Sequence, residues 1–288
     1  MRDSPSGCST ETCTMATKTR NGMEGTERDE RLFISSLEKG LKVLEAFEDM
    51  TTELGLQQIA DAAGQGKSGA QRLVYTLLQL GYLRRNPVTR KYRLSSKVFL
   101  RGYALVQTSD LVREAHDELV SINKECGDTC VLAMLEGAEI VVLSSIPGRH
   151  IDSLNVTVGM RFPANLATSG LMLLAWLSPE EVKSALDLDS SQDDDAARKF
   201  SALQAELASI REQRVCVTKD ALMPGNLSIS APVFDAAGRA IAAINVSTPK
   251  DRYPSADAIH NLSAIIVAGA EAVSARLGYT EILNKRKR

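Results

Sequence analysis

The sequence has no long apolar run and no large excess of charge of one sign. The apolar stretch 171–177 is far shorter than the roughly 18 to 20 residues that cross a bilayer, so a membrane-spanning protein is not expected. Residues 1–30 contain no apolar core and are rich in Ser, Thr, Gly and charge. This composition predicts a disordered leader over 1–30 and not a signal peptide.

Cysteine is scarce and shows no metal-binding spacing. Five cysteines occur, and no two form a Cys-x-x-Cys pair; they are Cys8, Cys13, Cys126, Cys130 and Cys216. An odd number of cysteines without a Cys-x-x-Cys pair argues against a disulfide framework or a zinc site. It favours a protein that resides in a reducing cytoplasm. With 44% hydrophobic and 24% charged residues, the 288-residue chain has the composition of a soluble protein of one large or two ordinary domains.

Active-site signatures are also missing. Residues 64–69 fit G-x-G-x-x-G and resemble the end of a P-loop, but a helical pattern precedes them and Asp61 stands where a P-loop needs glycine. A hydrolase or transferase is a further possibility; it would use Cys130 or Cys216 with His116, His150 or His260. Because no nucleophile elbow or metal-ligand spacing supports it, we expect no enzymatic activity, no metal and no cofactor.

What the chain does have is a run of positive charge. Between Gly64 and Arg93 there are seven basic residues and no Asp or Glu: Lys67, Arg72, Arg84, Arg85, Arg90, Lys91 and Arg93. Taken alone, such a run fits an ordinary solvated surface as well as a face that binds a polyanion. The elements that carry the run distinguish these two interpretations.

Residues 31–95 have the pattern of a winged helix-turn-helix. Apolar spacing predicts helices at 35–47, 56–63 and 67–80, the first opened by a capping box of Ser35 and Glu38. A glycine-containing turn separates the last two helices, and strands at 82–85 and 91–94 flank an Asn-Pro turn. All seven basic residues lie on the third helix and this hairpin, which favours DNA binding.

The remainder predicts a linker helix and a second, α+β domain. Residues 96–109 form the linker, whose apolar face suggests dimerisation, and Asp110 is expected as the N-cap of the next helix. The second domain spans 110–280, and 281–288 form a basic, solvated tail. The predicted strands of the second domain are 129–135, 139–146, 153–158, 215–219, 227–234 and 240–247. Its predicted helices cover 110–125, 166–177, a segment from 178, 196–214 and a closing helix around 259–277.

Several ordered segments between residues 36 and 279 form a set with characteristic spacings. In the first domain they are residues 36–44, 59–61, 67–68 with 71–73, 80–83 and 92–94. In the second they are Gly159-Met160-Arg161-Phe162-Pro163-Ala164, residue 170 with 173–175, 229–235 and 242–247. Over these segments the chain resembles the IclR family of bacterial regulators. The resemblance implies a winged helix-turn-helix, a linker helix and a GAF-like mixed-sheet effector domain. It also implies homodimers or tetramers on palindromic operators. Segment 159–164 looks most like the branch that regulates aromatic-acid breakdown.

The expected DNA contacts fall into two groups. Lys67, Ser68, Gln71 and Arg72 face base edges from the start of the third helix, where Gln and Arg can bind adenine or guanine in a bidentate way. Arg84, Arg85, Arg90 and Lys91 contact phosphates, which supply affinity and salt dependence. Residues 66–72, Gly-Lys-Ser-Gly-Ala-Gln-Arg, depart from the family's usual Pro-Lys-Ser-Thr-Val-His-Arg.

The expected effector contacts come mainly from the resemblance. Thr168 and Ser169 would offer hydroxyl and N–H groups to a carboxylate at a helix start. Ser228, Asn245 and Ser247 match pocket-lining positions, and Thr218 stands where some members carry Asp. Met134 and Met160 would form an apolar wall. Two positions depart from the family, which commonly has His at Asn165 and Lys at Leu171.

These features predict a cytoplasmic regulator of a catabolic operon that binds double-stranded DNA and senses a small organic or aromatic acid. The alternative is a small-molecule-binding or scaffold protein that does not bind DNA. Effector identity, operator sequence, the direction of regulation and the choice between dimer and tetramer are not encoded in these patterns.

Overall fold

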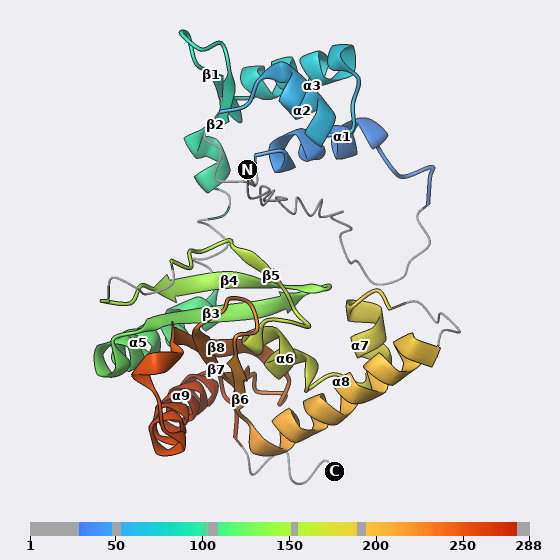
Figure 1. The fold of residues 1–288 in the computed structure, drawn as a ribbon. Helices are drawn as coiled ribbons and strands as arrows, with labels where there is room; N and C mark the ends of the chain where they lie inside the picture. Colours follow the sequence, from blue (N-terminus) through green and yellow to red (C-terminus); the bar gives the residue numbers. More distant parts are fainter. Residues whose placement is uncertain are drawn as a thin grey trace, which may run out of the picture.

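The computed structural model describes residues 29–47, 53–100, 102, 109–150, 155–188 and 194–280 (Figure 1). Nearly all of the predicted leader, the predicted tail and linker residues 101 and 103–108 lie outside these ranges. Within them, residues 96–100 are helical, as predicted for the start of the linker.

The N-terminal unit consists of three helices and a hairpin in the predicted order. The helices are α1 (Ser35–Glu45), α2 (Leu56–Ala62) and α3 (Lys67–Gln79), and the strands are β1 (Leu83–Arg85) and β2 (Tyr92–Leu94). Val43, Ile59 and Val74, one from each helix, pack together with Leu83 and Tyr92 of the hairpin. Leu54 extends the hairpin by pairing its backbone with Tyr92 in both directions. The helix-turn-helix therefore has its own apolar core.

The start of α1 differs from the prediction, and packing decides which of its apolar residues are buried. Ile34 occupies the N-cap position without a side-chain cap, so Ser35 is the first helical residue and the predicted capping box is wrong. Val43 is fully buried, whereas Leu37 and Leu41 are 60% and 49% exposed. The apolar residues of this helix are numerous enough to form two stripes, and packing against α2 and α3 selects the stripe that contains Val43.

The C-terminal unit is built on one antiparallel sheet of six strands in the order β5-β4-β3-β8-β7-β6. The strands are β3 (Thr129–Glu136), β4 (Glu139–Ile146), β5 (Arg161–Pro163), β6 (Cys216–Lys219), β7 (Asn226–Phe234) and β8 (Ala240–Pro249). The hairpins β3–β4 and β7–β8 confirm the predicted strand pairs. The combination of this sheet with helices confirms the α+β class, but all five strand pairs of the described sheet are antiparallel, so the mixed sheet implied by the resemblance is wrong.

The strand predicted at 153–158 is wrong in its described part. Residues 155–158 do not belong to a strand, and the edge strand of the sheet is β5, which follows them. The backbone turns here instead: Met160 N–H donates to Thr157 O, and Gly159 N–H donates to Val142 O with Gly159 at φ 89°. Apolar residues at alternating positions predict a strand here. The backbone N–H groups of Gly159 and Met160 find their acceptors through the turn instead, so they need no strand pairing.

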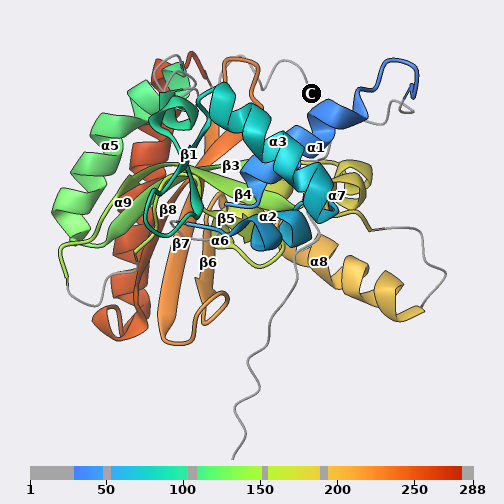
Figure 2. The same cartoon turned by 90° about the horizontal axis from the view of Figure 1, so that it is seen from above.

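Helices cover both faces of the sheet (Figures 1 and 2). Helices α5 (Asp110–Cys126) and α9 (Ala256–Arg276) pack on one face. Helices α6 (Thr168–Leu174), α7 (Pro179–Ala185) and α8 (Asp194–Gln213) are associated with the other face. A short 3₁₀ helix, η1 (Lys250–Arg252), joins β8 to α9. Two apolar clusters result, one on each face of the sheet.

Two helix starts test the predicted caps. The N-cap of α5 is Ser109, whose Oγ accepts from Val112 N at 3.4 Å, so Asp110 is the first helical residue and not the cap. Helix α7 begins as predicted, with Pro179 as its first residue and a capping box between Ser178 and Glu181. Helix α6 starts at Thr168, two residues later than predicted.

Helix α9 corrects the expectation about apolar runs, because it is long and apolar enough by length and composition to cross a membrane. Leu262, Ile266 and Val273 are buried against the sheet, and Gly269 lies against Ile122 of α5. Such a helix can also be the core helix of a soluble domain. The packing of α9 on β7 and α5 supports this second interpretation.

Candidate DNA-binding face and effector cavity

Helix α3 presents a polar face opposite its buried one. Ala70, Val74 and Leu77 face the core. The predicted base-contacting residues lie on the solvent side and are all exposed: Lys67, Ser68, Gln71 and Arg72. The spacing of the three core residues therefore turns the four polar side chains outward from the start of the helix. Gly66 is the N-cap, and Gly69 lies within the first helical turn.

Sequence reasoning missed Tyr75 on this face. Its side chain is 62% exposed, one helical turn after Gln71. Tyr75 lines a shallow groove in which α3 meets the hairpin; the groove also contains Ser68, Gln71, Arg72, Arg85 and Tyr92. A tyrosine four residues after Gln71, on a face that is otherwise polar, was the available signal.

Arginines of the hairpin stand opposite one another. Arg84 of β1 is paired in register with Arg93 of β2, and both side chains are exposed. Neither forms an ion pair within the described part of the chain. Like charges directly across two strands repel each other, and a polyanion bound between or beside them removes that repulsion. Arg93 was counted in the basic run but was not among the predicted phosphate contacts.

The turn of the hairpin is held by a hydrogen-bond network. Asn86 Oδ1 accepts from Val88 N at 2.9 Å and from Thr89 N at 3.2 Å. Glu53 accepts from Asn86 Nδ2 at 2.6 Å and from Thr89 Oγ1 at 2.8 Å. These donors, first that of Asn86, hold the pKa of Glu53 below its usual value. The network fixes the path of the turn before Arg90, which has φ 61°.

The four predicted phosphate contacts are not equivalent in the structure. Arg84, Arg90 and Lys91 are exposed on the hairpin. Arg85 is partly engaged within the protein, because its Nε donates to Arg90 O at 3.1 Å and its guanidinium lies 5.5 Å from the Tyr92 ring centroid. Arg85 can therefore approach a phosphate only with its remaining N–H donors, or after leaving these contacts.

The C-terminal unit contains a cavity of about 360 Å³ on the face of the sheet that carries α6. Six of the eight predicted effector residues line it: Met160, Thr168, Ser169, Ser228, Asn245 and Ser247. Thr218 is outside the lining, but its Oγ1 lies 2.6 Å from Thr168 Oγ1 and so supports that residue. Met134 is also outside the lining and is exposed near the end of β3.

One wall of the cavity is a polar row on β7 and β8. Ser228 and Ser247 are paired in register, with their hydroxyl oxygens 3.0 Å apart. Asn226 Nδ2 donates to Ser228 Oγ, and Asn245 Nδ2 donates to Ser247 Oγ, both at 3.0 Å. The Oδ1 atoms of both asparagines are buried and have no hydrogen-bond partner among the described residues, and an unsatisfied buried acceptor is costly. Sequence reasoning missed Asn226, although it alternates with Ser228 and Ser230 on one strand.

The rest of the described lining is mainly apolar and carries no charged side chain. It includes Val131, Ile140, Val142 and Phe162. The two positions that depart from the family pattern lie outside the lining. Leu171 is buried in the apolar cluster beside the cavity, and Asn165 is exposed. The cavity can thus offer a ligand an apolar surface and a row of neutral hydrogen-bonding groups.

Two family models match the chain. The model of the IclR helix-turn-helix domain matches residues 36–87, which contain α1 to β1. The model of the bacterial transcriptional regulator IclR C-terminal domain matches residues 103–275, which contain the sheet and its helices.

Curated proteins and solved structures give the same assignment. The chain is 31% identical over 248 residues to the HTH-type transcriptional regulator XynR of Escherichia coli, covering 85% of this chain and 98% of that protein. It is 29% identical over 242 residues to the Pca regulon regulatory protein of Pseudomonas putida, covering 83% and 82%. A solved IclR homolog from Microbacterium hydrocarbonoxydans, complexed with 4-hydroxybenzoate, matches its fold with a TM-score of 0.70 at 23% identity, covering 84% and 98%.

Proposed function

Since the chain belongs to the IclR family of bacterial transcriptional regulators, we propose that it is a cytoplasmic homo-oligomer that controls a catabolic operon and has no catalytic activity. It binds operator DNA through the N-terminal unit and a small organic acid through the cavity. We divide the chain at 31–95 for DNA binding, 96–109 for the linker and 110–280 for effector binding. The order of the elements and the two separate apolar cores support this division.

One observation supports DNA binding above all: the first turn of α3 and the basic hairpin are both exposed to solvent. Gln71 and Arg72 are assigned to base edges, with Lys67 and Ser68 beside them. Arg84, Arg85, Arg90 and Lys91 are assigned to phosphates. Arg93 and Tyr75 join these contacts, because Arg93 faces Arg84 across the hairpin and Tyr75 lines the same groove as Gln71.

Exposed apolar residues of the N-terminal unit support dimerisation. Ile34, the N-cap of α1, and Leu37 and Leu41 within α1 follow one another with about one helical turn between them, and all three are exposed. A soluble monomer rarely leaves such a stripe uncovered. A second copy that covers it would place two α3 helices on the two halves of a palindromic operator.

The salt dependence of DNA binding tests this assignment. An operator is first selected from random DNA. Arg84→Ala should then weaken binding of the dimer to this operator, because the substitution removes one phosphate contact from each protomer, about two in all. The slope of log K against log salt concentration should then fall by about 2. Arg198→Ala, at an exposed position on α8, is the matched control and should leave affinity and slope unchanged. An unchanged slope in Arg84→Ala, or no selectable DNA, would favour the scaffold alternative.

The effector is assigned to small organic acids, aromatic acids included. Thr168 and Ser169 place hydroxyl groups in the cavity at the start of α6, where a carboxylate can accept from them. The apolar wall formed by Val131, Val142 and Phe162 suits a hydrocarbon ring or chain. The 4-hydroxybenzoate bound by one structural relative is an acid of this kind.

A thermal-unfolding screen against such acids tests the effector assignment. A ligand at about a hundred times its dissociation constant should add roughly 2.7 kcal/mol to the stability of the folded state. Asn245→Ala should reduce the ligand-induced shift, whereas Asn261→Ala, at an exposed position on α9, should preserve it. If no acid in a broad panel shifts the unfolding midpoint, or if Asn245→Ala binds as well as wild type, the cavity is not the effector site.

Regulation requires that the effector distinguish two states of the oligomer. A ligand can shift an equilibrium only by the difference between its affinities for the two arrangements. In this proposal the two arrangements differ in the spacing of the paired α3 helices. The measurable consequence is reciprocal: the effector changes operator affinity by the same factor by which the operator changes effector affinity.

A further inference from the structure

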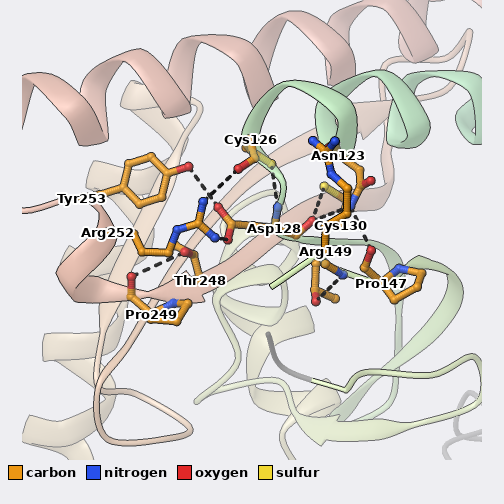
Figure 3. Close-up of polar contacts among 12 residues, drawn as sticks. Asn123, Cys126, Asp128, Cys130, Pro147, Arg149, Thr248, Pro249, Arg252 and Tyr253 are labelled. Atoms are coloured by element: carbon orange, nitrogen blue, oxygen red, sulfur yellow. Dashed lines mark hydrogen bonds and ion pairs between the residues drawn. The ribbon is translucent and has the colours of Figure 1, made fainter. Parts of the chain in front are cut away.

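Two cysteines meet at the corner between α5 and β3 (Figure 3). Cys126 is the last residue of α5, and Cys130 lies near the start of β3. Both sulfur atoms contact the backbone of Asp128: its N–H donates to Cys126 Sγ at 3.4 Å, and Cys130 Sγ donates to its carbonyl at 3.5 Å. The two sulfur atoms therefore contact the backbone of one residue, although three residues separate the two cysteines in the sequence.

This corner is rigidly built. The buried carboxylate of Asp128 pairs with Arg252 at 2.6 Å and accepts from Tyr253 OH at 2.9 Å. Asn123 Nδ2 donates to the Asp128 carbonyl at 2.7 Å (Figure 3). Gly127 turns the chain with φ 79°, and a Cβ at this position would lie 2.7 Å from His150 Nε2. Packing and hydrogen bonds thus fix the backbone on which both sulfurs rest.

The environments of the two thiols are unequal. Hydrogen bonding from Cys130 lowers the pKa of Cys126, which is only partly buried. The same contact, together with burial, raises the pKa of Cys130, which is fully enclosed. Cys216 lies apart on β6, and burial raises its pKa to about 12. The thiol that solvent can reach thus has the lowered pKa and the enclosed thiol has the raised pKa, which is the usual arrangement of an attacking and a resolving cysteine.

We propose that Cys126 and Cys130 are a peroxide-sensitive pair that closes into a reversible disulfide. The Cys126 thiolate attacks one peroxide oxygen, the O–O bond breaks, and the released hydroxide takes up a proton to leave as water. Cys126 is then a sulfenic acid. The Cys130 sulfur displaces its hydroxyl group, the S–S bond forms, and a second water leaves with the Cys130 proton. Two electrons pass from the two thiols to one hydroperoxide molecule.

Within the described part of the chain all three cysteines are free, which suits this chemistry. Disulfides in reducing compartments are mostly transient and serve redox sensing or catalysis. Val131, the residue after Cys130, lines the effector cavity, so the pair lies one residue from that site along β3. The proposal nevertheless stands independently of the effector assignment, because it depends only on the geometry of the corner.

Peptide mapping of the oxidised full-length protein tests the proposal. Cys8 and Cys13 are first replaced by serine, so that only Cys126, Cys130 and Cys216 can react. The protein is treated with equimolar hydrogen peroxide, denatured, alkylated and digested with trypsin. The peptide 125–149 contains both corner cysteines and no other cysteine. It should appear about 2 Da lighter than its reduced form and unalkylated, and dithiothreitol should restore alkylation at both positions.

Single variants and Cys216 provide the controls. In Cys130→Ser, Cys126 should stop at the sulfenic acid and be trapped by dimedone; in Cys126→Ser, Cys130 should stay reduced. Cys216 should stay reduced during the peroxide treatment and should therefore be alkylated in every sample. The proposal is overturned if peptide 125–149 stays fully alkylated, if Cys126 of the native pair accumulates as sulfinic acid, or if Cys216 oxidises as fast as the pair.

Discussion

Gly170 is the position at which one added methyl group should disturb both stability and ligand binding. It lies in α6, two residues after Thr168, which lines the cavity. A Cβ added to Gly170 would lie 2.5 Å from Ala164 Cα and 2.7 Å from Ala164 C, and closer still to the carbonyl oxygen. All three atoms belong to the backbone, so no side-chain rotation relieves the clash. The helix and the loop before it have to separate.

The expected cost follows from two opposing contributions. Alanine is favoured over glycine inside a helix by up to about 1 kcal/mol. Overpacking a well-packed interior costs about 1 to 3 kcal/mol, and a clash with three backbone atoms belongs at the upper end. Gly170→Ala should therefore destabilise the C-terminal unit by about 2 kcal/mol net, which lowers its unfolding midpoint by about 4 to 8 °C.

Gly269→Ala is the matched control, because Gly269 is also a buried helical glycine. Its added Cβ would meet Ile122 Cδ1 at 2.7 Å and Cγ1 at 3.3 Å, atoms at the movable end of a side chain. Rotation of Ile122 offsets much of this clash, so Gly269→Ala should stay within about 1 kcal/mol of wild type. Calorimetry of both variants with and without effector measures the two effects. If Gly170→Ala is as stable as Gly269→Ala and binds effector normally, the reasoning about the backbone contact is wrong.

Three further variants probe the polar networks. Arg252→Met should destabilise the protein by about 3 to 5 kcal/mol in denaturant unfolding, because the Asp128 carboxylate, only 1% exposed, loses its charged partner. Tyr253→Phe removes one hydrogen bond to the same carboxylate and should cost less, about 1.5 to 3 kcal/mol; equal effects would contradict this ranking. Hydrogen bonds from Asn86 and then Thr89 hold the pKa of Glu53 below 4.5, so its support of the hairpin turn is complete above pH 4.5 and is lost as the pH falls through the lowered value. The NMR amide shifts of residues 86 and 88–90 should titrate in this acid range and cease to do so in Glu53→Gln; a titration that persists in this variant would rule Glu53 out as its source.

Local sequence patterns were sufficient for the elements whose signals are local. The apolar spacing over residues 67–80 placed α3 as a helix, although its buried residues are Ala70, Val74 and Leu77 and its last leucine, Leu80, is exposed. The Asn86-Pro87 turn placed the hairpin, and the Ser178–Glu181 pair with Pro179 placed the start of α7. In each case the deciding interaction joins residues within about one helical turn or one tight turn.

Tertiary structure decided what depends on partners far apart in the chain. The choice of Val43 over Leu37 for the core, and of β5 over residues 153–158 for the sheet edge, depended on packing and on backbone partners elsewhere. Ser228 meets Ser247 only because β7 pairs with β8, and Met134 lies outside the cavity because it lies beyond the part of β3 that pairs with β8. The sequence by itself thus determined the order of elements and the charge of the DNA-binding face, since these arise from neighbouring residues. Only the fold determined which side chains share the cavity, because those contacts join segments that periodicity cannot relate.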